Sequence, residues 1–145
     1  SYTCMVAPYM IDSAHPLCGV NGVFNGIFLH GNALGDAMFY GSGAGKLPTA
    51  SAVVADVVDM ARHQHTNIYI DWKPEKLTLV SYDDSVNRFF VRTDSPKEEV
   101  EKIFGNVSYV ENVVDGEYGF TTEAMAEKDF AAKADKINVI NRIRL

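Results

Sequence analysis

The fold of this chain is decided by one stretch, Val86-Asn-Arg-Phe-Phe-Val-Arg-Thr-Asp-Ser-Pro-Lys-Glu-Glu-Val-Glu-Lys-Ile-Phe-Gly105. Its first part is β-branched and aromatic, which predicts a strand over Val86–Thr93. Ser95-Pro-Lys-Glu98 has the spacing of a capping box with proline in the first turn, so a helix should follow and end at Gly105. The apolar face of that helix is formed by Val100, Ile103 and Phe104.

After Gly105 the sequence predicts further strands and a second helix. Val107–Val114 reads as a strand, and Asp115-Gly116 is a two-residue hairpin signal that leads into a strand over Glu117–Glu123. A second helix and a last strand follow, marked by the apolar positions Phe130, Ala131, Ala134 and Ile137 and by Asn138–Leu145. The order βαββαβ predicts a ferredoxin-like fold, a four-stranded antiparallel sheet with both helices on one face. Many unrelated functions use this fold.

A three-glycine turn runs into another helix upstream, in Phe39-Tyr-Gly-Ser-Gly-Ala-Gly-Lys-Leu-Pro-Thr-Ala-Ser-Ala-Val-Val-Ala-Asp56. Pro48 suits the first helical turn. The helix start offers free N–H groups and a positive dipole end to an anion. The helix has one apolar stripe, formed by Ala50, Val53, Val54, Val57, Val58 and Ala61.

This turn matches neither of two known phosphate-binding loops. A dinucleotide fingerprint requires glycine at Lys46, and a P-loop requires glycine at Tyr40 and Ser or Thr at Leu47. From the residues alone the functional signal is therefore weak. A glycine turn that lets a helix pack close to a sheet is the first interpretation.

Composition excludes several classes of protein. The 145 residues are 47% hydrophobic and 22% charged, which suits one ordinary globular domain or two small ones. A net charge of −6 with scattered Lys and Arg argues against nucleic-acid binding. The sequence also has no apolar run of the about 20 residues that a membrane span needs, and no signal-peptide pattern, so we expect a cytoplasmic protein. Cys4 and Cys18 read as reduced thiols, and His63 and His65 as a solvated helix end; no metal site is expected.

The first part of the chain contains fewer elements. We expect a strand around Tyr2–Ile11 and a β-hairpin that joins Asn25–His30 to Asp36–Tyr40. With one helix, this unit should not close its own core, and its missing partners would lie on another chain or on sequence absent here. The fold class is α+β: a partial β-sheet with one long helix over residues 1–70, a linker over 71–84, and the βαββαβ unit over 85–145.

Two stretches carry a family resemblance. Asp12-Ser-Ala-His-Pro-Leu-Cys-Gly-Val-Asn-Gly-Val-Phe-Asn25 and the segment from Gly35 through the glycine turn to Asp56 resemble the C-terminal part of homoserine dehydrogenase. The βαββαβ unit is similar to the C-terminal ACT domain of longer family members, and Ile140-Asn-Arg-Ile-Arg144 fits its last strand. The part that resembles the catalytic domain and the βαββαβ unit together cover nearly the whole chain.

The resemblance implies a parent enzyme that interconverts aspartate semialdehyde and homoserine with NAD(P)H, in threonine, methionine and isoleucine biosynthesis. It places the nucleotide-binding domain and the catalytic lysine upstream of Ser1, on the same polypeptide. We therefore assign no catalytic residue, expect no tightly bound cofactor, and expect the isolated chain to be inactive. The resemblance also implies a homodimer.

The resemblance implies that Gly43, Ala44 and Gly45 lie beside the cofactor. Small residues ahead of a helix start let main-chain N–H groups approach a nicotinamide or a phosphate. Thr49 offers a hydroxyl to the same site, and capping the helix start is an equally good use of it. Lys46 reads as a solvated lysine.

ACT domains often bind an amino acid where two of them pair, and threonine is the natural effector in this pathway. Amino-acid-binding members usually carry a glycine in the loop between the first strand and helix. Here Thr93-Asp-Ser-Pro-Lys-Glu-Glu-Val100 has no glycine, and Glu98 and Glu99 would repel the effector carboxylate. The loop therefore disfavours threonine, and Asp94 with Ser95 reads as a capping turn.

The alternative function is a free-standing ACT-like module that senses a small molecule or mediates dimerisation. A free-standing ACT-like module would not need a dehydrogenase-like hairpin, a glycine turn and a valine-rich helix. The first unit therefore favours the enzyme fragment.

Overall fold

The computed structural model describes the backbone of residues 1–145 and the side chains of all residues except 111–113. The chain divides into two compact units, one made of Ser1–Met10 with Glu75–Leu145 and the other of Ile11–Pro74. The first ten residues thus group with the C-terminal half of the chain, across the boundaries expected from the sequence.

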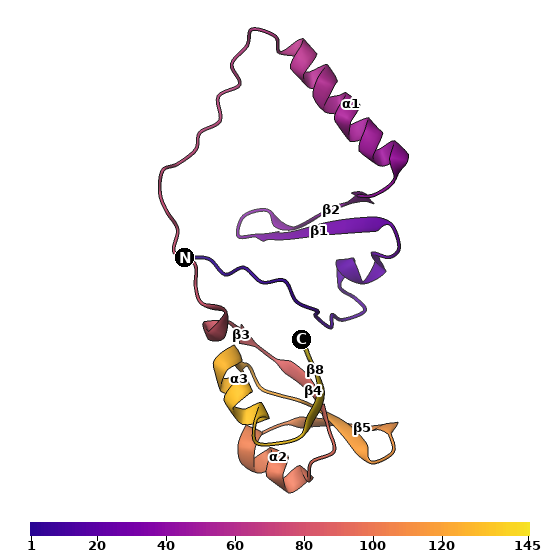
Figure 1. Cartoon of the computed structure of the whole chain (residues 1–145), viewed down its shortest axis with the longest axis vertical. Helices are drawn as coiled ribbons and strands as arrows, with labels where there is room; N and C mark the ends of the chain where they lie inside the picture. Colours follow the sequence, from indigo (N-terminus) through magenta and orange to yellow (C-terminus); the bar gives the residue numbers. More distant parts are fainter. The chain divides into compact units, whose positions relative to one another are not determined.

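The C-terminal unit is built on a four-stranded antiparallel sheet, and the chain is of the α+β class, as predicted (Figure 1). The strands lie in the order β5-β6-β4-β8. The elements follow one another as β4 (Phe89–Thr93), α2 (Lys97–Phe104), β5 (Ser108–Val114), β6 (Glu117–Thr121), α3 (Glu127–Ala134) and β8 (Val139–Arg144). This is the predicted βαββαβ order, and the Asp115-Gly116 turn lies between β5 and β6, where Val114 pairs with Glu117.

The core of this unit lies between the sheet and both helices. Phe89 and Val91 of β4 are fully buried, so one face of the strand points inward. The ring of Phe130 on α3 lies 3.9 Å from that of Phe89 and 5.9 Å from that of Phe104 on α2. Phe104 also packs on Phe120 of β6, with ring centroids 5.2 Å apart. Both helices therefore cover the same face, and each buried aromatic contributes about 1.5–3 kcal/mol.

Two predicted details of this unit are wrong. The expected strand over Val86–Thr93 is interrupted at Arg88, because β3 (Val86–Asn87) pairs with β7 (Met125–Ala126) whereas β4 pairs with β6 and β8. The expected capping box does not form, because α2 starts one residue later. Its N-cap is Pro96, which has no side-chain capping bond. Ser95 lies just outside the helix and bonds elsewhere in the chain.

The expected N-terminal strand is also absent. In place of a strand over Tyr2–Ile11, the structure has two isolated parallel bridges, Tyr2 with Leu79 and Tyr9 with Arg144. The N–H of Met10 donates to the carbonyl of Arg144 at 2.7 Å. Tyr9 and Met10 therefore lie beside the end of β8, and Tyr2 lies beside Leu79, without forming a regular strand.

The second unit contains the predicted hairpin and helix (Figure 1). Strands β1 (Phe24–Gly31) and β2 (Gly35–Ser42) pair antiparallel, from Phe24 opposite Ser42 to Gly31 opposite Gly35. They are preceded by the short 3₁₀ helix η1 (Pro16–Gly19) and followed by α1 (Lys46–Arg62). A second 3₁₀ helix, η2 (Tyr82–Asp84), belongs to the C-terminal unit.

The Ile11–Pro74 unit has no buried residue. On the apolar stripe of α1, Val53 is 58% exposed and Val57 is 53% exposed. An amphipathic helix gains most of its stability by burying such a stripe. Residues outside this unit are therefore needed to bury the apolar stripe of α1. No helix in the part of the chain that the structure describes is long and apolar enough to cross a membrane.

Candidate functional site

The predicted site residues lie together where β2 passes into α1. Gly45 is the N-cap of α1 and has φ 121° and ψ 155°. This region of backbone conformation is essentially restricted to glycine. A side chain at position 45 would therefore strain the turn, and glycine is required here by the backbone itself.

Gly43 lies against the side chain of Asn25. A Cβ atom at position 43 would lie 2.1 Å from Asn25 Nδ2 and 2.9 Å from Asn25 Cγ. Asn25 lies on β1 opposite Gly41 of β2, and this pairing brings its amide to the turn. Sequence reasoning missed Asn25 as a site residue, although the hairpin register was a signal for it. A side chain at position 43 would therefore require the Asn25 amide to move.

The N-terminus of α1 is neither capped by a side chain nor balanced by a negative charge in its first turn. The Thr49 N–H donates to the Gly45 carbonyl at 3.1 Å, but the Thr49 hydroxyl does not cap the helix. The positive end of the helix dipole is therefore not neutralised by its own chain, and it suits an anion or a carbonyl oxygen.

All four predicted cofactor residues, Gly43, Ala44, Gly45 and Thr49, are exposed on this turn and the first turn of α1. Together they offer main-chain donors, one hydroxyl and, from Asn25, one amide. Such a set can bind and orient a ligand. It contains no group that would take up or release a proton near neutral pH.

The histidines and acidic residues do not assemble into a metal site. Outside residues 111–113, no three His, Cys, Asp or Glu side chains come together as metal ligands would. His30 Nδ1 lies 2.5 Å from Asp36 Oδ1 at the turn end of the hairpin, and both side chains are mostly exposed. This pair reads as an ordinary surface contact.

A buried carboxylate, Glu127, links several elements of the C-terminal unit. It was not identified from the sequence. Glu127, at the start of α3, is 3% exposed. Arg144 on β8 donates to it from Nε at 2.5 Å and from Nη2 at 3.0 Å. The Tyr82 hydroxyl donates at 2.8 Å and Asn87 Nδ2 at 3.0 Å. The carboxylate therefore joins η2, β3, α3 and β8.

The hydrogen bonds decide the ionisation of Glu127. Burial by itself raises the pKa of this carboxyl, but the bonds from Arg144 and Tyr82 outweigh burial and hold the pKa below its ordinary value. The same contact with Glu127 raises the pKa of Arg144. The pair is therefore ionised at neutral pH. Its partners are other protein groups, so it serves the fold.

The loop between β4 and α2, where an effector was considered, is bonded to Asn138, and the Tyr118 hydroxyl also donates to the Ser95 carbonyl at 2.6 Å. Asn138 precedes β8; its carbonyl accepts from Thr93 Oγ1 at 2.6 Å and its N–H donates to Ser95 Oγ at 2.9 Å. Its side-chain amide donates to Asp94 Oδ1 at 2.9 Å. Asp94 and Ser95 thus do not form the expected capping turn. They hold two loops of the sheet together.

Comparisons with known proteins agree on one family. The family model for homoserine dehydrogenase matches residues 1–58. A homoserine dehydrogenase of Lactococcus lactis is 34% identical over 94 residues, which are 63% of this chain and 22% of that protein. One from Synechocystis is 56% identical over 55 residues, which are 38% of this chain and 13% of that protein.

A solved structure extends the likeness to the whole chain. The homoserine dehydrogenase of Thiobacillus denitrificans superimposes with a TM-score of 0.79 at 26% identity, covering 99% of this chain and 38% of that one. The chain therefore spans about a fifth or less of those two curated relatives and less than two fifths of this solved structure.

Proposed function

We propose that the chain belongs to the homoserine dehydrogenase family and forms the C-terminal portion of an enzyme that reduces aspartate semialdehyde to homoserine with NAD(P)H. One observation carries this proposal. The family match over residues 1–58 includes the glycine turn and most of α1, the part of the chain where the structure has an open helix start.

The proposed role of the turn is to form one edge of the cofactor site. Gly43, Ala44 and Gly45 present main chain without bulky side chains, so a nicotinamide amide or a phosphate oxygen can approach the N–H groups at the start of α1. Thr49 adds a hydroxyl, and Asn25 adds an amide beside Gly43. These groups bind and orient the cofactor; hydride transfer needs groups that the turn does not contain.

We assign the C-terminal βαββαβ unit to the ACT type, with a role in regulation or pairing. The threonine effector remains disfavoured. Thr93, Asp94 and Ser95 each already bond to Asn138, so a ligand at this loop would have to displace protein hydrogen bonds. A homodimer in the cytoplasm is the assembly we propose, and the uncovered apolar stripe of α1 supports the dimer.

The experiment places this chain in a complete enzyme. The equivalent segment of the Thiobacillus denitrificans homoserine dehydrogenase is replaced by residues 1–145, and homoserine-dependent reduction of NAD⁺ or NADP⁺ is measured. We expect activity. Gly45→Val should then raise the KM for the cofactor about tenfold or more, because valine cannot adopt the Gly45 backbone conformation that shapes the turn.

Gly41→Ala is the matched control. Gly41 is near the same end of β2, but a Cβ atom there meets nothing within 4 Å. This variant should leave the KM for the cofactor unchanged. If both variants have the cofactor KM of the unmodified chimera, with folding verified by the melting temperature, the turn is not part of the cofactor site.

A further inference from the structure

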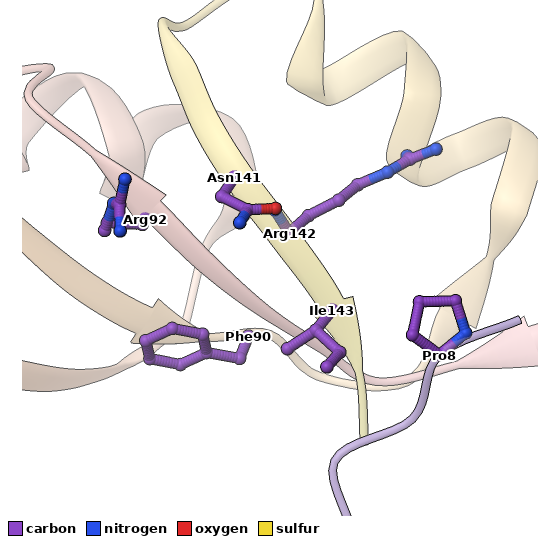
Figure 2. Close-up of a pocket in the computed structure, with 6 residues that line it drawn as sticks. All are labelled: Pro8, Phe90, Arg92, Asn141, Arg142 and Ile143. Carbon is purple, nitrogen blue, oxygen red and sulfur yellow. The ribbon is translucent and has the colours of Figure 1, made fainter.

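The sheet of the C-terminal unit has a second face, opposite its helices, and this face carries a pocket. Phe90 and Arg92 alternate with the buried residues of β4, so they point to this face. On β8 their partners are Ile143 and Asn141. The pocket has a volume of about 330 Å³, within the range of small-molecule sites. It is lined by Pro8, Phe90, Arg92, Asn141, Arg142 and Ile143 (Figure 2).

One side of the pocket is apolar. Phe90, Ile143 and Pro8 lie in a row along it (Figure 2). The Phe90 ring lies directly over Gly119 of β6, where a Cβ atom would come within 2.6 Å of the ring carbons Cε2 and Cζ. Glycine at position 119 therefore lets the ring lie against the sheet. The row forms a surface that suits an aliphatic or aromatic group.

The other side of the pocket is polar and cationic. Arg92 and Asn141 lie there, whereas the Arg142 side chain points away (Figure 2). The Arg142 guanidinium is 5.0 Å from the Phe130 ring, on the helix-covered face. The positive charge that faces the pocket is therefore that of Arg92.

Arg92 has hydrogen-bonding capacity left. Its Nε lies 2.9 Å from Glu117 Oε2, but neither atom makes an aligned hydrogen bond. A guanidinium has five N–H donors in a planar fork, so its Nη groups can bind a second carboxylate while Glu117 stays beside Nε. Because Glu117 already balances the charge of Arg92, a ligand with two negative charges would be repelled, and one with a single carboxylate fits best.

We propose that this pocket binds a small monocarboxylate with an apolar body. The carboxylate bonds to the Nη groups of Arg92 and to the Asn141 amide, and the body packs on Phe90, Ile143 and Pro8. The site lies on the sheet of the βαββαβ unit and on Pro8 of the N-terminal segment, and it uses no residue of the glycine turn. Its existence is therefore independent of the proposed dehydrogenase activity.

The test uses hexanoate as the probe and the full chain as the protein. Amide chemical shifts are followed by NMR during titration, and we expect saturable shifts at Phe90, Arg92, Asn141 and Ile143. Hexanamide, which lacks the charge, and acetate, which lacks the apolar body, should each bind about tenfold or more weakly.

Three variants separate the charge from the fold. Arg92→Gln should weaken hexanoate binding about tenfold or more, because the charge-assisted bonds are lost. Glu117→Gln should strengthen binding, because it removes the competing carboxylate. Lys128→Gln is the control: it removes a positive charge from the exposed surface of α3, does not line the pocket, and should leave the affinity unchanged. Melting temperatures verify that each variant is folded.

Three results would overturn the proposal. One is the absence of saturable shifts at these residues at millimolar hexanoate. Another is equal affinity of Arg92→Gln and the unmodified chain. The third is a set of shifts that follow protein concentration instead of hexanoate, since the face would then be covered by a second copy of the chain.

Discussion

Glu127 accepts four side-chain hydrogen bonds from three residues of the C-terminal unit. Its carboxylate is buried, and its partners Tyr82, Asn87 and Arg144 come from segments far apart in the sequence. A buried charge is tolerated only when it is paired and hydrogen-bonded, as this one is. Loss of the carboxylate would leave Arg144 with a charge that no longer has a counterpart.

We therefore predict that Glu127→Gln destabilises the chain by about 3 kcal/mol, because removing one partner of a buried pair leaves the other uncompensated. Urea unfolding followed by circular dichroism measures this loss. Lys128→Gln is the control, since Lys128 on the same helix pairs with Asp84 at 2.7 Å on the exposed surface. It should change stability little. Equal effects of the two substitutions would contradict the role given to Glu127.

Glu127 also predicts an acid dependence of stability. Its pKa in the folded chain lies below the ordinary value of 4.5, so the unfolded chain binds the proton more readily. Its contribution is fully present above the unfolded pKa and is lost as pH falls through the folded pKa. The melting temperature of the unmodified chain should therefore approach that of Glu127→Gln as the pH is lowered below about 4.5. A difference between them that stays constant from neutral to acid pH would refute this.

At the scale of elements, the β4–α2 loop allows a test of where helix α2 begins. The sequence pattern assigns Ser95 and Glu98 to a capping box, whereas the structure bonds Ser95 Oγ to the N–H of Asn138 at 2.9 Å. Ser95→Ala should cost about 1–2 kcal/mol, because the Asn138 N–H loses its acceptor. Glu98→Gln should stay within about 0.5 kcal/mol, as for an ordinary surface position. Chemical unfolding of both variants gives the two values, and a larger loss for Glu98→Gln would favour a different start for α2.

The same loop predicts the response to threonine. Because Thr93, Asp94 and Ser95 are already bonded to Asn138, millimolar threonine should leave the melting temperature of the chain unchanged. A saturable increase, specific to L-threonine over D-threonine, would show that the loop opens for an effector.

These elements show which features local sequence can predict. The Asp115-Gly116 hairpin depends on neighbours in sequence, and it was predicted correctly. The start of α2 was not, because it depends on Asn138, which lies 43 residues from Ser95. Glu127 was missed for the same reason: its partners come from separate elements. The sequence assigned Gly43 to a cofactor site. Its contact with Asn25 could not be predicted from neighbouring residues, because it depends on how β1 and β2 pair in the hairpin.

At the scale of the whole molecule, the two units differ in how they are stabilised. The C-terminal unit has a buried aromatic core and a buried ion pair. The Ile11–Pro74 unit has no buried residue, and its valine stripe is exposed. A unit of this kind suits a part of a larger assembly, and we propose that other segments of that assembly cover the stripe and complete the cofactor site. The predicted cofactor residues belong to this unit, so their function depends on that cover.

The central claim is that this chain supplies one edge of a cofactor site and none of the catalytic groups of homoserine dehydrogenase. The most direct measurement is a turnover assay on the isolated 145-residue chain, with homoserine and NAD⁺ or NADP⁺, monitored by the absorbance of the reduced nicotinamide. We predict no homoserine-dependent reduction. Reproducible turnover by the purified chain, abolished by a substitution within residues 1–145, would contradict the account.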